Sequence, residues 1–282
     1  MILVTGSDGQ LGSSLRSVLK SEALFLNSSE LDITKIDNIK AVVDGCNPSC
    51  IVNCAAYTNV EKAESDSERA FDVNEGGVRN LAVVCEMNKI RLIHISTDYV
   101  FDGQKSIPYT EEDIPNPINI YGKSKLAGER AILDTSCDAI IIRTSWLYSV
   151  SEDNFVSKVL NMLKTKDVLN IVYDQIGSPT FSDDLARCIS VFIDGHKVKG
   201  QHIFHYSNEG VASWYDFACY ISKLSGLYKP IRPIRSSMFP TEADRPSFTL
   251  LSKDKIKSVM FVDINHWSRS LELCLSMKIL NR

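Results

Sequence analysis

The sequence lacks a long apolar run and any concentration of one charge. Of its 282 residues, 44% are hydrophobic and 23% are charged, and no apolar run reaches the roughly 18 residues that a membrane-spanning helix needs. The formal net charge is −4 and no basic run stands out, so binding to nucleic acid or to anionic membranes is not favoured. The first six residues lack the charged leader and cleavage site of a secretory signal. We therefore expect a cytoplasmic globular protein with neither kind of partner.

The eight cysteines lack the spacings of a metal site. None belongs to a Cys-x-x-Cys pair, and no histidines stand at the spacings of a zinc site. Most of the cysteines lie within apolar stretches, which indicates reduced, buried thiols in a cytosolic protein. The sequence therefore predicts no metal site.

A glycine-rich turn follows the first apolar run. Residues 2–4 suit a strand buried on both faces, and Gly6, Gly9 and Gly12 then precede a helical pattern. Glycine permits a tight turn and a close approach of the backbone to a pyrophosphate, and the N-terminus of the next helix offers free N–H groups to the anion. An ordinary glycine-rich loop is the alternative. The order of strand, turn and helix favours dinucleotide binding.

The tip of the second predicted strand bears on the choice of dinucleotide. A carboxylate at the end of this strand would bind the ribose 2′-hydroxyl of NAD. Residues 23–26 are instead followed by Asn27, Ser28 and Ser29, with no arginine there to bind a 2′-phosphate strongly. We therefore favour NADPH as the cofactor, with NADH as a second possibility.

Strand-like and helix-like patterns alternate along the first half of the chain. The next predicted elements are strands at residues 50–53, 91–96 and 139–143 and a long helix at residues 65–88. This alternation predicts an α/β fold with a doubly wound parallel sheet of the Rossmann type. After residue 146 the alternation loosens. We expect residues 1–146 to form mainly the dinucleotide-binding domain and residues 147–282 mainly a smaller C-terminal substrate-binding lobe, with some segments returning to the sheet.

Tyr121 and Lys125 stand four residues apart, which places them on one face of a predicted helix. A nearby ammonium favours the phenolate, so the lysine is expected to lower the pKa of the tyrosine and make a usable acid and base. The alternative is an ordinary amphipathic surface helix. Thr97 follows the fourth predicted strand, and the carboxyl ends of parallel strands face the region where ligands bind. The sequence therefore predicts that these three side chains meet.

Four motifs stand in the order typical of extended short-chain dehydrogenases/reductases. They are residues 6–12, 53–56, 96–98 and 121–125. Within that superfamily, longer runs resemble the dTDP-4-dehydrorhamnose reductase family. These runs are residues 53–58, 96–103, 121–129, 143–148, 174–180 and 245–246. The likeness covers nearly the whole chain.

This resemblance implies an NADPH-dependent reduction of the C4 carbonyl of dTDP-4-dehydro-L-rhamnose, giving dTDP-L-rhamnose. Tyr121 would donate the proton to the carbonyl oxygen, Lys125 would hold the nicotinamide ribose, and Thr97 would hydrogen-bond the same carbonyl. The residues implied to contact the sugar nucleotide are Thr97, Asp98, Trp146 and Arg245. The residues implied to contact the cofactor are Gly6, Gly9, Gln10, Leu11, Gly12, Asp32, Ile33, Ala55, Ala56, Tyr57, Tyr121 and Lys125.

Several of these side chains have a structural alternative. Asp32 could cap the following helix, and Asp98 could cap a turn. Trp146 could belong to the core, and Arg245 could hold the second lobe together instead of binding a diphosphate bidentately. His94 lies within a strand-like run, and we interpret it as structural.

Other functions stay open at this point. The chain could be a different nucleotide-sugar reductase or epimerase, or a non-catalytic regulatory subunit that binds a cofactor. The presence of the tyrosine, the lysine and the threonine argues against the regulatory subunit. Some members of the family are reported with magnesium, but no cluster of metal ligands in this sequence supports it. A homodimer is possible because members of the superfamily are often dimers.

Overall fold

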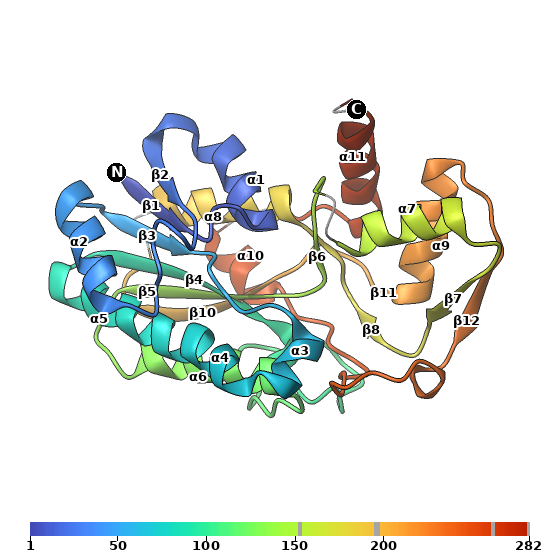
Figure 1. Cartoon of the computed structure of the whole chain (residues 1–282), viewed down its shortest axis with the longest axis horizontal. Coiled ribbons are helices and arrows are strands. Elements are labelled where there is room, and N and C mark those ends of the chain that lie inside the picture. Colours follow the sequence, from blue (N-terminus) through green and yellow to red (C-terminus); the bar gives the residue numbers. More distant parts are fainter. Residues whose placement is uncertain (152–153, 195–197, 261–262, 281–282) are drawn as a thin grey trace.

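The structure, a computed structural model, describes residues 1–151, 154–194, 198–260 and 263–280. At its centre lies a six-stranded parallel sheet in the order β10-β5-β4-β3-β1-β2 (Figure 1). The strands are β1 (Ile2–Thr5), β2 (Ala23–Leu26), β3 (Cys50–Asn53), β4 (Arg91–Thr97), β5 (Ala139–Thr144) and β10 (Gln201–Tyr206). The predicted doubly wound α/β fold is therefore confirmed.

Helices cover both faces of this sheet, and the buried strands accordingly carry apolar residues on both sides. On one face lie α1 (Gln10–Leu19) and α8 (Ser182–Asp194), which also contact each other. On the other face lie α2 (Ile36–Cys46), α5 (Val78–Asn88) and α6 (Ile120–Leu133) (Figure 1). The sheet is thus the middle layer of a three-layer domain.

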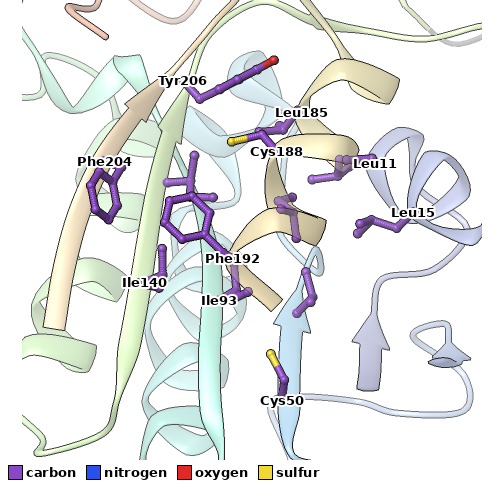
Figure 2. Close-up of a cluster of buried hydrophobic side chains, with 14 of the residues drawn as sticks. Leu11, Leu15, Cys50, Ile93, Ile140, Leu185, Cys188, Phe192, Phe204 and Tyr206 are labelled. Atoms are coloured by element: carbon purple, nitrogen blue, oxygen red, sulfur yellow. The ribbon is translucent and has the colours of Figure 1, made fainter. Parts of the chain in front are cut away.

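Figure 2 shows the core on the α1 and α8 side of the sheet. Leu15 of α1 and Phe192 of α8 pack there with Ile93 and Ile140 of the central strands. All four side chains are almost completely buried. This core presses α1 onto the sheet and so fixes the turn that precedes it.

The connection from β3 to β4 is broken into several helical pieces, whereas the sequence predicted one long helix at residues 65–88. The pieces are α3 (Val60–Ser65), α4 (Ser67–Phe71), a π-helical turn (Asp72–Gly77) and α5. The wide π-turn contains Asn74, which is completely buried and bonds to both backbone groups of Tyr57. A π-turn inside a helix often marks a functional site, and this one lies against α6.

The second lobe is built from short strand pairs and helices, at the right of Figure 1. The pairs are β6 (Leu147–Tyr148) with β9 (Thr180–Phe181), β7 (Leu169–Val172) with β12 (Ile231–Ile234), and β8 (Ile176–Gly177) with β11 (Ala212–Ser213). The helices are α7 (Phe155–Thr165), α9 (Trp214–Ser225) and α11 (Trp267–Leu280). They enclose an apolar core of their own. The chain leaves this lobe to add α8, β10 and α10 (Asp254–Met260) to the first.

In the part of the chain that the structure describes, no helix is long and apolar enough to cross a membrane.

Candidate active site

Thr97, Tyr121 and Lys125 meet at the edge where the parallel strands end. Thr97 is the last residue of β4, Tyr121 is the second residue of α6, and Lys125 lies one helical turn further on. The Thr97 hydroxyl lies near enough to the Tyr121 phenol to act on its pKa. Thr97 and Lys125 are buried, and Tyr121 is partly buried. The three side chains that the sequence singled out therefore lie at one place.

The start of α6 is held tightly, which fixes the direction of Tyr121. Asn119 caps the helix by accepting the Gly122 N–H at 2.8 Å, and its amide donates to the Asp244 carbonyl at 2.8 Å. Gly122 packs so closely on Tyr99 that a Cβ atom would lie 2.2 Å from the Tyr99 carbonyl oxygen. The Tyr99 ring meets the Tyr121 ring edge to face at 5.9 Å. Glycine at position 122 is thus required for this approach.

Burial raises the pKa of Tyr121 to about 12, with the Thr97 hydroxyl acting in the opposite direction and the Asp98 carboxylate adding to the rise. The sequence predicted the reverse, a pKa lowered by Lys125. The reason for the difference is that desolvation disfavours the phenolate more than nearby donors stabilise it. Burial also lowers the pKa of Lys125, to about 8. At neutral pH the phenol therefore carries its proton, which suits a proton donor.

Asp98 lies beside this trio with one carboxylate oxygen unused. Its Oδ1 accepts the Thr97 hydroxyl at 3.1 Å, whereas its buried Oδ2 has no hydrogen-bond partner among the described residues. Burial raises the pKa of Asp98 to about 7. A buried polar atom without a partner is costly, and a hydroxyl of a bound molecule would satisfy it. This supports the predicted contact between Asp98 and a sugar.

The glycine turn fits a pyrophosphate. Gly6 has φ +63°, and a Cβ atom there would lie 2.6 Å from the Ala55 nitrogen, while one at Gly12 would lie 2.6 Å from the Gly6 oxygen. Helix α1 begins at Gln10 after Gly9, with no side chain capping it. Its first N–H groups are thus free to bind an anion. The residues present therefore suit the dinucleotide that the turn predicts.

Two predicted cofactor residues near this turn also have structural contacts. The Leu11 side chain points into the core beneath the sheet (Figure 2), so only its backbone can serve a ligand. Gln10 accepts a hydrogen bond from Ser149 of the second lobe at 2.9 Å. The phosphate-binding turn is thereby linked to the substrate lobe.

The tip of β2 carries a carboxylate that the sequence pattern concealed. Glu30 accepts the Asn27 N–H at 2.9 Å, while the Asn27 side chain accepts the N–H groups of Ser29 and Glu30. These reciprocal bonds close the turn after β2. The prediction of a tip without a carboxylate is therefore wrong, because a residue three positions further on folds back to it.

Asp32 and Ile33, predicted to contact the adenosine, lie just beyond this turn. Asp32 accepts the backbone N–H and the hydroxyl of Thr34, and these bonds are the main cause of its lowered pKa. Its carboxylate shapes the approach to α2 but is not the capping residue of that helix, which is Lys35. Ile33 is buried, and a Cβ atom on Gly77 would lie 2.6 Å from its Cγ1. A contact of either residue with adenosine stays a prediction.

The residues after β3 lie next to the glycine turn. The Ala55 N–H donates to the Asn53 side chain at 3.1 Å, and the Ala55 backbone packs against Gly6. Ala56 and Tyr57 are partly exposed there, and the Tyr57 hydroxyl donates to Asp66 at 3.0 Å. Small side chains at this point leave space at the sheet edge where the predicted nicotinamide half would lie.

Trp146 opens the second lobe in a strained conformation, with φ +46°. Its ring stacks on Trp214 at a centroid distance of 3.6 Å, and the Trp214 indole N–H donates to Gln175 at 3.1 Å. Positive φ for a bulky residue is a genuine outlier and often accompanies function. Trp214 carries no signal in the sequence, because nothing in its local pattern shows that two indoles 68 positions apart would stack.

Arg245 forms an ion pair with Glu61 of α3, and its Nε is buried without a partner among the described residues. The Glu61 carboxylate also accepts the N–H groups of Glu242 and Ala243. These contacts tie the loop before Arg245 to the helices that flank the site. They favour the structural alternative for Arg245, and its contact with a diphosphate stays a prediction.

Among the described residues, no group of three or more histidine, cysteine, aspartate or glutamate side chains lies where it could hold a metal ion.

Comparison with known proteins shows the family of this chain. The family described as "RmlD substrate binding domain" matches residues 1–279. A dTDP-4-dehydrorhamnose reductase from Aggregatibacter actinomycetemcomitans is 40% identical, over 96% of this chain and 97% of that protein. The chain belongs to the dTDP-4-dehydrorhamnose reductase family. The Bacillus anthracis dTDP-4-dehydrorhamnose reductase, solved in complex with NADP, superposes with a TM-score of 0.94 at 35% identity, covering 98% of each chain.

One relative of this chain has a different substrate in its name. It is a dTDP-4-keto-6-deoxy-D-glucose reductase from Streptomyces niveus, 39% identical over 95% of this chain and 94% of that protein. A UDP-glucose 4-epimerase from Thermus thermophilus, 16% identical with a TM-score of 0.84, shares the fold. The named reductases thus differ in the sugar that their names give, and the epimerase shows a likeness of fold alone.

A buried ion pair behind the site was missed by the sequence analysis. Glu129, one turn beyond Lys125, accepts two hydrogen bonds from Arg143 at 2.9 and 2.7 Å and one from Ser96 at 2.5 Å. Both charged side chains are about 2% exposed or less. These hydrogen bonds anchor α6 to β4 and β5 directly behind Thr97. The sequence places Lys125 and Glu129 on one face of a helix, but it does not show which strands carry the partners of Glu129.

The raised pKa of Asp98 leads us to expect a specific pH dependence of the free energy of unfolding. Its pKa rises from the ordinary 3.8 to about 7 on folding, so between these values the folded state binds more protons than the unfolded state. Stability contributed by Asp98 is therefore full below about pH 4 and is lost as the pH rises through about 7. In Asp98→Asn we expect the difference in unfolding free energy between pH 5 and pH 8 to shrink, measured by urea denaturation at both values. An unchanged difference would contradict the raised pKa.

Proposed function

We propose that the protein reduces the C4 carbonyl of dTDP-4-dehydro-L-rhamnose to dTDP-L-rhamnose with NADPH. The observation that carries this proposal is the meeting of Thr97, Tyr121 and Lys125 at the sheet edge beside a pyrophosphate-binding turn. The family and the named relatives support the same reaction. We further propose a cytoplasmic location, and a homodimer as the assembly.

The side chains act on the carbonyl oxygen, where negative charge develops. Bound NADPH supplies the hydride to C4. Tyr121 donates its proton to the oxygen, completing the alcohol, and Thr97 donates a hydrogen bond to that oxygen as charge builds up. The raised pKa of Tyr121 keeps the phenol protonated until the oxygen becomes basic enough to take the proton. Asp98 holds a sugar hydroxyl through its free Oδ2.

The remaining residues bind and orient. Lys125 donates to the nicotinamide ribose, and the N–H groups at the start of α1 hold the pyrophosphate. The stacked pair of Trp146 and Trp214 offers an apolar face to the sugar nucleotide. Orientation of this kind supplies much of the rate in a hydride transfer between two bound molecules.

The purified protein is expected to oxidise NADPH when it is given dTDP-4-dehydro-L-rhamnose, with one NADPH consumed for each dTDP-L-rhamnose formed. The assay follows NADPH absorbance and identifies the sugar by chromatography. dTDP-4-keto-6-deoxy-D-glucose, the substrate in the name of the Streptomyces relative, is the competing sugar. Faster turnover of that sugar would reassign the substrate but keep the chemistry. The absence of NADPH oxidation with both sugars would refute the reductase.

Tyr121→Phe removes only the phenolic oxygen and should lower kcat by about 100-fold or more, because a positioned general acid contributes on that scale. The affinity for NADP⁺, measured by calorimetry, should stay near that of the wild type. Tyr228→Phe is the matched control, since that tyrosine is 78% exposed. Turnover that survives in Tyr121→Phe would remove Tyr121 from the role of proton donor.

Glu30→Gln should shift nucleotide preference towards the 2′-phosphate, because the carboxylate at the tip of β2 repels that group. We expect the affinity for adenosine 2′,5′-bisphosphate relative to AMP to rise by about 3-fold to 10-fold at low salt and less at high salt. Calorimetry measures this without turnover. Glu112→Gln, on an exposed loop, is the control for loss of charge. Equal ratios in all three proteins would show that Glu30 does not face the ribose.

A further inference from the structure

Three neighbouring strands place polar side chains in one row beneath the site. Thr5, Asn53 and His94 are paired across β1, β3 and β4 in the strand register. All three are about 1% exposed or less in a sheet whose other positions there are apolar. The row ends at Lys125, whose Nζ lies 3.5 Å from His94 Nε2. A polar chain thus runs from the strand that precedes the pyrophosphate-binding turn to the proposed catalytic lysine.

The hydrogen bonds in this row determine which nitrogen of His94 carries the proton. The Ala55 backbone N–H can only donate, and it meets Asn53 Oδ1 at 3.1 Å, where the Thr5 hydroxyl also donates at 2.7 Å. The Asn53 amide oxygen is thereby identified, and its NH₂ group faces His94 Nδ1 at 3.0 Å. Since an NH₂ group only donates, Nδ1 must accept. A neutral His94 therefore carries its hydrogen on Nε2.

The surroundings of His94 exclude the charged imidazolium. A proton on Nδ1 would point at the Asn53 NH₂ group, which is also a donor, and the Lys125 ammonium places an unfavourable positive charge on the other side. Burial first and Lys125 second hold the pKa of His94 well below its ordinary value. Geometry and electrostatics thus select the same neutral tautomer.

Lys125 makes a hydrogen bond of its own next to His94, and its pKa depends on the groups around it. Its Nζ donates to the Ile95 carbonyl at 2.6 Å, on the side of β4 next to His94. The other titratable groups that act on it are Glu129 on the same helix and Cys54 after β3, and both raise its pKa. Burial opposes them and prevails, which lowers the pKa of Lys125 to about 8. The Nε2–H of His94 points at an amine that can lose its proton.

We propose that His94 is a positioning residue for Lys125: Asn53 holds its imidazole as the Nε2–H tautomer, and this N–H stabilises the lone pair of the neutral Lys125 amine. The proposal rests on the role proposed for Lys125 above. After Tyr121 gives its proton to the sugar oxygen, the phenolate must regain one. The Lys125 ammonium supplies this proton, so that one N–H bond breaks as the Tyr121 O–H bond re-forms. The lone pair left on Nζ then accepts a hydrogen bond from the His94 Nε2–H, until the amine takes up a proton from water. His94 itself neither gains nor loses a proton.

Nuclear magnetic resonance of the whole chain labelled with ¹⁵N tests the tautomer directly. Long-range ¹H–¹⁵N correlations distinguish the two ring nitrogens, and the missing signals of His94→Gln assign this residue among the five histidines. We expect hydrogen on Nε2 alone, from about pH 5.5 to about pH 9, where an ordinary histidine would titrate. Hydrogen on Nδ1, or an imidazolium within that range, would overturn the proposal. This measurement needs no turnover, so its outcome is independent of the proposed reaction.

The pH dependence of kcat separates positioning from a merely structural role. The leucine side chain of His94→Leu cannot donate to Lys125, so its kcat should fall at a higher pH on the alkaline limb of the profile, by about half a pH unit or more. Glutamine can accept from Asn53 and still donate to Nζ, so His94→Gln should keep the limb of the wild type. A limb that stays in place in both variants would overturn the proposal even if kcat falls. Should His94→Leu fail to fold, the tautomer measurement decides alone.

Discussion

Helix α6 approaches its neighbours so closely that two of its positions admit only glycine. A Cβ atom on Gly122 would lie 2.2 Å from the Tyr99 oxygen, and one on Gly128 would lie 2.1 Å from the Asn74 oxygen. Tyr121 is the neighbour of Gly122 in the chain, and Lys125 lies between Gly122 and Gly128. Because the helix cannot shift without breaking one approach or the other, the phenol and the amine are held at fixed places along the strand ends. Positioning to a fraction of an ångström is what hydride and proton transfer require.

The same close packing places charges where water cannot reach them. Glu129 and Arg143 form an ion pair in the interior, and Lys125 is buried one turn away. Removing such charges from water costs several kcal/mol for each ion, and only good hydrogen bonds offset the cost. Arg143 supplies two of these bonds to Glu129 and Ser96 a third. Burial of this kind contributes little net stability, but it gives α6 a single register against β4 and β5, and that register determines where Tyr121 lies.

The sequence was informative where function depends on local order and less so where it depends on distant contacts. Glycine spacing, strand periodicity and the spacing of Tyr121 and Lys125 predicted the parallel sheet and the meeting with Thr97. Glu30 was overlooked because its carboxylate reaches the tip of β2 only through a turn that Asn27 closes. The stacking of Trp146 on Trp214 and the pairing of Arg245 with Glu61 join segments far apart in the chain. Such contacts follow from how segments distant in the chain pack together, which no short pattern records.

The two main pKa shifts set the protonation states of Tyr121 and Lys125 before the reaction. Desolvation acts on both groups in the same sense, since it favours the neutral phenol of Tyr121 and the neutral amine of Lys125. For the reduction of a carbonyl, the phenol must hold its proton until hydride transfer makes the sugar oxygen basic enough to take it. The buried environment that makes the ground state neutral is therefore the one that makes Tyr121 a donor, and the lysine a group that can exchange its proton near the working pH.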